Sequence, residues 1–281
     1  MSRTGPRLFC IPATRAPVAA VLRRGPSAWS HVGRWDVGRG AYEPGAWIRA
    51  NLYPQRCDLS PDGRWLCYFT LKGPGRWKPG GTYVAISRLP WLTALAAWGT
   101  CGTWTRGLHF VDSRREWQVG VPDVGDPAPC RRKFGLVPTR AGTFAVERRR
   151  GWSETADTPP RAPSDAWDEQ RADAVAMEKA RPRSAGNTRL VVRGYFAAFR
   201  SVVPGGAKDV HYDVVEDGRV QPLPGVQWAD WHTDGRLLLA TVDGRLQIAR
   251  WSADRVDVET EVDVGRLVPD PAPPPAVARR W

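Results

Sequence analysis

The eight residues Leu59-Ser60-Pro61-Asp62-Gly63-Arg64-Trp65-Leu66 carry the strongest local structural signal in this chain. Asp-Gly is favoured in tight hairpin turns, because glycine reaches positive φ without a steric penalty. The triplet Asp-Gly-Arg recurs at Asp217-Gly218-Arg219, Asp234-Gly235-Arg236 and Asp243-Gly244-Arg245. Because each triplet precedes an apolar run, the four together predict repeated antiparallel hairpins with two-residue turns.

Two of these hairpins align with each other without a gap, from Arg56 and from Trp228. Both place an aspartate four residues before the turn aspartate, at Asp58 and Asp230. This equivalence favours a repeated structural use of the two carboxylates, such as accepting hydrogen bonds from backbone or tryptophan N–H groups. The separation of 172 residues equals four units of 43, and propeller blades have about this length.

The segment from Leu59 to Leu66 resembles the strand-turn-strand core of TolB-type and WD-type β-propeller repeats. This resemblance implies an all-β propeller and is uninformative about function, because such folds host many activities. Another resemblance, through residues 23–27, Trp35-Asp36 and residues 53–58, is to uncharacterised bacterial proteins of similar length, and it implies no activity. The middle of the chain departs from the propeller pattern, because the turn signature is missing there.

We therefore predict a single propeller-like domain over residues 1–268, with five or six blades of antiparallel hairpins. An insertion at 151–187 interrupts the pattern, and Ser164 could cap a helix over Asp165–Ala180 within it. Residues 269–281 are rich in proline and are expected to form an extended, flexible tail. Six strands are predicted in the C-terminal part: 211–216, 219–223, 226–231, 236–241, 245–251 and 255–262.

The formal net charge of +12 raises nucleic acid as a partner. Of the 41 basic residues only 5 are lysine, and alanine, glycine and proline are abundant. A GC-rich genome imposes this composition through its codons, whatever the function of the protein. The arginines are also dispersed along the chain, so a nucleic-acid-associated protein is kept as an alternative.

The five cysteines include no Cys-x-x-Cys pair, so no zinc site is predicted. Cys57 and Cys67 flank a turn, but the predicted register sets Cys67 opposite Asp58. We interpret the cysteines as buried thiols in a reducing compartment.

No segment approaches the ~20 apolar residues of a membrane span, and no secretory signal is recognised. A cytoplasmic protein without cofactor or metal is expected.

Two residue pairs could support acid–base chemistry, since residues two apart on a strand share a face. These pairs are His211 with Asp213, and Asp230 with His232. His232 occupies the position of Ser60 in the aligned repeat, where a polar side chain can brace the turn. No Gly-x-Ser-x-Gly elbow and no phosphate-binding loop before a helix is present.

The sequence thus predicts a non-enzymatic interaction module with an unknown protein partner, because repetition is evident and a complete catalytic constellation is not. The alternatives are a basic protein associated with nucleic acid and a hydrolase that uses the channel of a propeller. The hydrolase alternative requires histidine and aspartate side chains to converge at one mouth of that channel.

Overall fold

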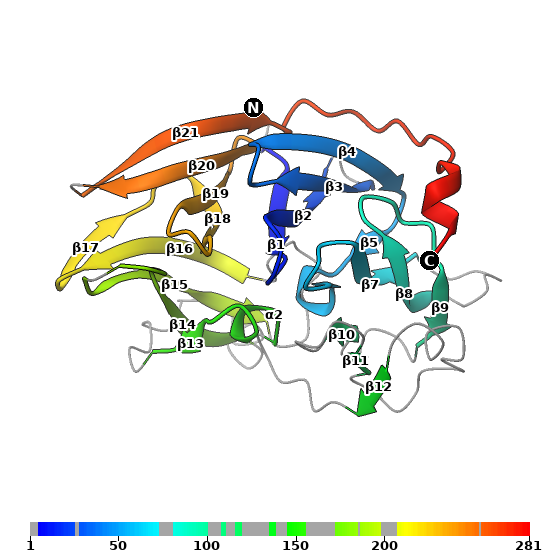
Figure 1. Ribbon diagram of the computed structural model, residues 1–281, viewed down its shortest axis with the longest axis horizontal. Helices are drawn as coiled ribbons and strands as arrows, with labels where there is room; N and C mark the ends of the chain where they lie inside the picture. Colours follow the sequence, from blue (N-terminus) through cyan, green and yellow to red (C-terminus); the bar gives the residue numbers. More distant parts are fainter. Residues whose placement is uncertain are drawn as a thin grey trace. The chain divides into compact units, whose positions relative to one another are not determined.

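The computed structural model describes residues 5–25, 28–72, 81–100, 108–110, 116–119, 135–138, 145–155, 172–184, 186–197, 207–252 and 254–281. The chain divides into two compact units. Unit 1 comprises residues 1–9 and 147–267, and unit 2 comprises residues 10–146 and 268–281. Strands dominate both units, so the predicted all-β class is confirmed (Figure 1).

Unit 2 is built from sheets that follow one another along the chain. The first sheet has the order β1-β2-β3-β4, and its first strand begins within unit 1. The second has the order β5-β7-β8-β9, with the short β6 also paired to β7. Their strands are β1 (Arg7–Pro12), β2 (Val18–Arg24), β3 (Ser30–Asp36), β4 (Ala41–Ile48), β5 (Asn51–Leu52), β6 (Asp58–Leu59), β7 (Trp65–Leu71), β8 (Thr82–Arg88) and β9 (Ala96–Gly99), with the 3₁₀ helix η1 (Pro54–Arg56) before β6.

The third sheet of unit 2 is smaller and consists of β10 (Leu108–Phe110), β11 (Glu116–Val119) and β12 (Gly135–Pro138). Its β11 and β12 are parallel, whereas β10 and β11 are antiparallel. A parallel pair needs a crossover connection instead of a tight hairpin. This sheet therefore departs from the pattern of simple hairpins that the sequence predicts.

Unit 1 contains two consecutive antiparallel sheets, ordered β13-β14-β15-β16-β17 and β18-β19-β20-β21. All six strands predicted in this part of the chain are confirmed. A short helix, α2 (Ala145–Arg148), precedes the first of these sheets. The strands are β13 (Ser153–Glu154), β14 (Ala172–Ala180), β15 (Thr188–Ala197), β16 (Ala207–Glu216), β17 (Arg219–Pro222), β18 (Val226–Trp231), β19 (Leu237–Thr241), β20 (Arg245–Ser252) and β21 (Arg255–Asp263).

The predicted helix over Asp165–Ala180 is wrong from residue 172 onward, where β14 pairs with β13 and β15. Its earlier part, like Ser164, lies outside the described residues. Alanine, glutamate, lysine and methionine favour helices, but strand pairing on both sides and burial of Met177 outweigh this local preference. Much of the predicted insertion thus belongs to a sheet.

The four Asp-Gly-Arg turns are of two kinds. Gly63, Gly218, Gly235 and Gly244 all have positive φ, between +72° and +92°. Only at Asp217-Gly218 do both turn residues have positive φ, +48° and +82°, which gives the predicted two-residue hairpin between β16 and β17. The other three loops are longer. The hydrogen bonds that span them join Ser60 with Trp65, His232 with Arg236 and Thr241 with Arg245.

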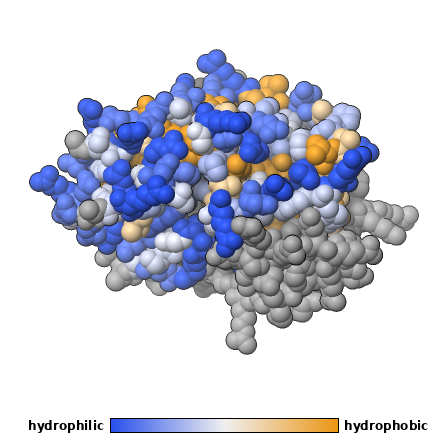
Figure 2. Space-filling model, viewed as in Figure 1, coloured by the Kyte–Doolittle hydropathy of each residue, from blue (hydrophilic) through white to orange (hydrophobic). Residues whose placement is uncertain are grey.

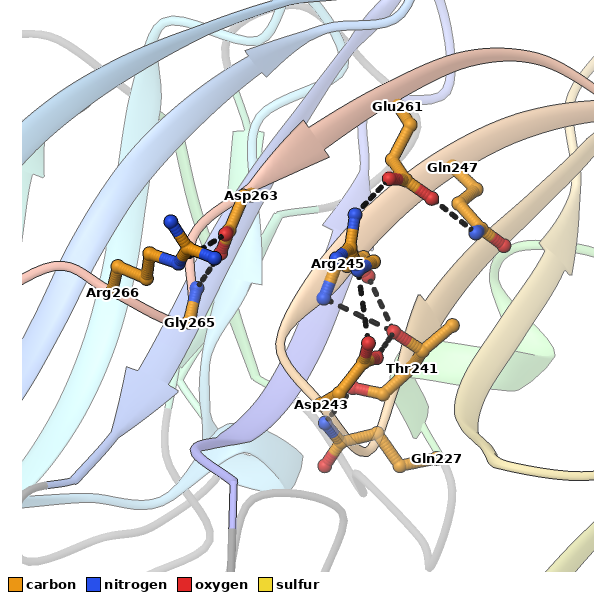
Figure 3. A network of polar contacts seen from close by, with 9 residues as sticks. All are labelled: Gln227, Thr241, Asp243, Arg245, Gln247, Glu261, Asp263, Gly265 and Arg266. Carbon is orange, nitrogen blue, oxygen red and sulfur yellow. Dashed lines mark hydrogen bonds and ion pairs between the residues drawn. The ribbon is translucent and has the colours of Figure 1, made fainter.

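The longer loops share a side-chain contact between the turn aspartate and the residue two positions before it. Ser60 and Thr241 donate hydrogen bonds to Asp62 and Asp243, and Nδ1 of His232 lies 2.8 Å from Oδ1 of Asp234. Figure 3 shows the third, where the Thr241 hydroxyl also accepts the backbone N–H of Arg245. At the two-residue turn the corresponding residue is Val215, which has no polar group. The sequence pattern [Ser/Thr/His]-x-Asp-Gly-Arg therefore marks the longer loop.

Tryptophans contribute heavily to the core, as their number predicts. Among the buried residues are Trp35, Trp65, Trp98, Trp152, Trp228, Trp231 and Trp251. Cys10, Cys57 and Cys67 are buried, as predicted, and burial raises the pKa of the Cys57 thiol to about 12. Cys67 lies opposite Asp58, which confirms the predicted register. Figure 2 shows hydrophilic residues over most of the described surface in this view.

The proline-rich C-terminal segment ends in the 3₁₀ helix η3 (Ala276–Arg279), in which Ala278 is fully buried. The ring of Trp281 lies 5.6 Å from that of Trp65, between centroids. The guanidinium of Arg88 lies 4.8 Å from the centroid of the same Trp65 ring. The end of the expected flexible tail is therefore packed within unit 2, where Trp281 lies beside Trp65 of β7.

Alanine at Gly244 should destabilise the protein more than alanine at Gly218. Both residues have similar positive φ, so each variant carries a backbone penalty of about 1 kcal/mol. A Cβ at Gly244 would lie 2.5 Å from the Cα of Gly265, whereas one at Gly218 meets nothing within 4 Å. We expect roughly 1–3 kcal/mol more loss for Gly244→Ala in urea unfolding. Equal losses would contradict the crowded turn.

Candidate functional site

A pocket of about 410 Å³ lies at the turn between β18 and β19 in unit 1. Its lining combines three arginines with two acidic residues, and the turn glycine forms part of the wall. Arg236 follows the turn, Arg250 and Glu259 come from β20 and β21, and Arg181 comes from the turn between β14 and β15. The pocket is lined by Arg181, Asp234, Gly235, Arg236, Arg250 and Glu259.

Arg181 is fixed in place by the backbone. Its Nε donates a hydrogen bond to the carbonyl oxygen of Gly235 at 3.0 Å, and its Nη1 donates to that of Trp251 at 3.2 Å. The guanidinium also lies 5.4 Å from the ring centroid of the buried Trp231. Among the described residues, no carboxylate lies within ion-pairing distance of it. Arg181 is thus a positioned cation whose charge lacks a direct counter-ion.

The other charges of the pocket are matched with one another. Arg236 pairs with Asp234 through Nη2 at 2.8 Å, and Nη1 lies 3.8 Å from Glu259. Arg250 pairs with Glu259 as well. Burial alone would raise the pKa of Asp234, but hydrogen bonds from Arg236 and His232 outweigh burial and lower it. Asp234 is therefore ionised, and both acidic side chains are occupied by arginines of the pocket.

A second pocket, of about 390 Å³, lies at the equivalent turn of unit 2. Arg64 takes the place of Arg236 and Asp62 that of Asp234, while Arg15 enters from the turn between β1 and β2. The backbone N–H of Arg15 donates to the carbonyl of Pro61 at 2.9 Å. This pocket is lined by Arg15, Ala16, Pro61, Asp62 and Arg64. At both of these turns, therefore, an arginine from another sheet joins the Asp-Gly-Arg sequence.

Asp230 is a buried residue of β18, close in sequence to the turn at the first pocket, and its side chain accepts several hydrogen bonds. Its Oδ1 accepts hydrogen bonds from the backbone N–H of Trp231, the indole of Trp152 and the ammonium group of Lys179, at 2.8, 3.2 and 2.6 Å. Lys179 lies on β14, so the carboxylate joins the two sheets of unit 1. The side chains of Lys179 and Asp230 are only 13% and 3% exposed, which makes this a buried ion pair.

Asp58 is the equivalent carboxylate in unit 2 and is likewise buried. Its Oδ1 accepts the N–H of the following residue, Leu59, as Asp230 does with Trp231. Its Oδ2 accepts the backbone N–H of Phe110 at 2.8 Å, which ties β6 to β10. Both carboxylates thus accept a hydrogen bond from the backbone N–H of the next residue. They differ in the second strand that they contact, which is β10 for Asp58 and β14 for Asp230.

The structure does not assemble the two predicted acid–base pairs. Asp230 turns toward Lys179, whereas Nδ1 of His232 lies 2.8 Å from Asp234. His232 follows the last residue of β18 and so belongs to the turn, which is why the same-face argument fails. Asp213 forms an ion pair with Arg193, and His211 is exposed.

His31 lies in a buried aromatic cluster of unit 2. The backbone N–H of Gly45 donates to its Nε2 at 3.2 Å, while Nδ1 lies 3.3 Å from the hydroxyl of Tyr42. Trp47 packs beside the ring, with 4.5 Å between centroids. Burial and the nearby charge of Arg23 lower the pKa of His31 to about 4. The imidazole is therefore neutral at physiological pH.

Within the part of the chain that the structure describes, no cluster of three or more His, Cys, Asp or Glu side chains could hold a metal ion. In that same part, no helix has the length and apolar character needed to cross a bilayer. Comparisons with models of protein families, with curated proteins and with solved structures found no match.

Sequence reasoning identified the turn aspartates but not the arginines that complete the pockets. Arg181 stood in a segment interpreted as the end of a helix, and Arg15 in an irregular N-terminal stretch. A usable signal is the Arg-Pro pair in Arg181-Pro182, since proline favours the turn between β14 and β15. Neither arginine has a neighbour in the sequence that points to the distant Asp-Gly-Arg turn.

Replacing Asp230 with asparagine should destabilise the protein by about 3 kcal/mol or more, because the buried ammonium group of Lys179 would lose its charge partner. Asp217→Asn is the matched control, since Asp217 is exposed and asparagine tolerates its positive φ. Urea unfolding of both variants measures the difference. A loss below 1 kcal/mol for Asp230→Asn would contradict the buried ion pair.

His31 should make stability fall as the pH falls. The unfolded imidazole binds a proton below its ordinary pKa of 6.5, whereas the folded one does so only near 4. Stabilisation present above pH 6.5 is therefore lost progressively down to about pH 4. Between pH 7.5 and 4.5, unfolding experiments should show a loss roughly 2–3 kcal/mol larger in the wild type than in His31→Gln. His211→Gln, at an exposed site, should retain the wild-type pH dependence.

Proposed function

We propose that this chain is a non-enzymatic interaction module of the β-propeller type that binds a protein partner through its Asp-Gly-Arg turns. The observation that carries the proposal is the repetition of one pocket design at the turns of two repeats. In each, an arginine from another sheet lies against the turn. A structural turn needs no such pocket, so the repeated pockets favour a binding role.

The succession of sheets supports the propeller part of this proposal. Five sheets follow one another along the chain, and most are meanders of four or five strands, as propeller blades are. Propellers close by bringing the two ends of the chain together. In unit 1, Gln227 of β18 accepts a hydrogen bond from the N–H of Leu8 and donates one to the carbonyl of Pro6.

The order of the sheets gives a different number of units between the two aligned hairpins from the number that the sequence predicts. Asp58 and Asp230 are three sheets apart in the described order, whereas the sequence separation suggested four units of 43 residues. The individual sheets occupy unequal lengths of chain. Dividing the sequence separation by a uniform period of 43 residues therefore does not give the number of sheets between the two residues. Five blades is the number that we propose.

A nucleic-acid-associated role is the second candidate, because each pocket has one more arginine than it has acidic residues. The histidines give less support to the channel hydrolase. His31 and His109 are buried, and His232 is bonded to its own turn. We therefore rank the protein-binding module first.

Affinity capture from cells that make the protein tests this function. We expect the tagged wild type to retain a specific protein after nuclease treatment, and a variant with Arg181→Glu and Arg64→Glu to lose it. A variant with His211→Glu and Arg219→Glu, changed only at exposed positions outside the pockets, is the control. Loss of the captured material on nuclease treatment would favour nucleic acid, and equal retention by all variants would contradict the proposed surface.

A further inference from the structure

We infer that the pocket at the β18–β19 turn binds a single carboxylate group of an acidic peptide segment, with Arg181 as its anchor. This inference rests on the proposed function and specifies the chemistry of the partner. Three features support it: the contacts that hold Arg181, the charge balance of the pocket lining and the ion pairs of the neighbouring strand.

Arg181 is prepared for an anion before any ligand arrives. Two backbone carbonyls and the ring of Trp231 hold its guanidinium, so little side-chain entropy remains to be lost on binding. Its Nη2 makes no hydrogen bond among the described contacts, and the residue lines the pocket. A guanidinium with an open edge binds carboxylate or phosphate oxygens.

The charge of the pocket favours a ligand with one negative charge. Three arginines and two acidic residues line it, so one positive charge remains after the internal pairs are counted. Asp234 and Glu259 are taken by Arg236 and Arg250. Glu216 is not part of the lining but interacts electrostatically with Arg181, and it keeps its negative charge because its hydrogen bonds come from the neutral side chains of Thr188 and Trp251. One carboxylate completes the balance of the lining residues. A doubly charged phosphate exceeds it, and the negative charge of Glu216 disfavours such a ligand further.

The neighbouring edge strand offers no run of unpaired cations to a polyanion. β21 presents four carboxylates at alternating positions, and an arginine pairs with each of them. The phosphates of a nucleic acid extend on both sides of any one contact and need further cations there, which these ion pairs do not supply. A short peptide can place one acidic side chain in the pocket and direct its other residues away. The observations therefore favour a peptide over a nucleic acid.

Fluorescence anisotropy with a labelled, amidated peptide Gly-Ser-Glu-Glu-Ser-Gly tests the inference in the full-length protein. We expect this peptide to bind about tenfold more tightly than its Gln-Gln counterpart, the amount that one charge-assisted hydrogen bond supplies. Arg181→Gln should remove the preference. Arg219→Gln, which removes the same charge from an 83% exposed side chain outside the pocket, should keep it.

A second variant keeps the test informative if Arg181→Gln does not fold. Glu259→Gln leaves Arg181 intact and removes a competing carboxylate, so it should tighten binding of the glutamate peptide. Equal binding of the two peptides, or equal effects of Arg181→Gln and Arg219→Gln, would overturn the inference. Tighter binding of a labelled dT12 oligonucleotide that is lost in Arg181→Gln would also overturn it, in favour of nucleic acid. If peptide binding fails while nuclease-resistant capture persists, only the carboxylate inference is lost.

Discussion

A polar side-chain contact within each longer turn accompanies the geometry on which the hairpins and pockets depend. Ser60 and Thr241 donate hydrogen bonds to the aspartate two residues further on, and Nδ1 of His232 lies 2.8 Å from Asp234. The two-residue turn at Asp217-Gly218 lacks such a contact, and the turn glycine has positive φ in all four turns. Because loop length fixes strand register, the residue at this position is linked to the choice of side chains that enter the core. This contact also holds the turn aspartate beside the arginine that follows the glycine.

Buried carboxylates secure these hairpins to the elements around them. Asp230 reaches β14 through Lys179, and Asp58 reaches β10 through the N–H of Phe110. In unit 1, Lys179 and Arg181 lie two residues apart at the end of β14, so the element that carries the buried ion pair also carries the pocket cation. The pocket cation is therefore anchored beside a buried ion pair of the core. A side chain that is held in place before binding loses little conformational entropy when a ligand binds.

Local patterns predicted the hairpins well and the long-range contacts poorly. The six C-terminal strands and the Asp58–Cys67 register follow from alternation and turn residues, which act over short distances. The segment around Met177 was mistaken for a helix, because strand pairing with β13 and β15 overrides its helix-favouring composition. Arg181 was missed for a related reason: its meeting with Gly235 spans 54 residues. The pairing of Asp230 with Lys179 was also not predicted, because the two residues are 51 positions apart in the sequence and no local pattern connects them.

Hydrogen–deuterium exchange of the protein, alone and saturated with its captured partner, tests most directly whether the turns form the binding surface. We expect protection on binding to concentrate in residues 180–184 and 232–237, where Arg181 meets the Asp-Gly-Arg turn. The β16–β17 hairpin, whose two-residue turn lines neither pocket, should exchange at an unchanged rate. Protection centred on residues 211–222, with none at the β18–β19 turn, would show that the partner binds elsewhere.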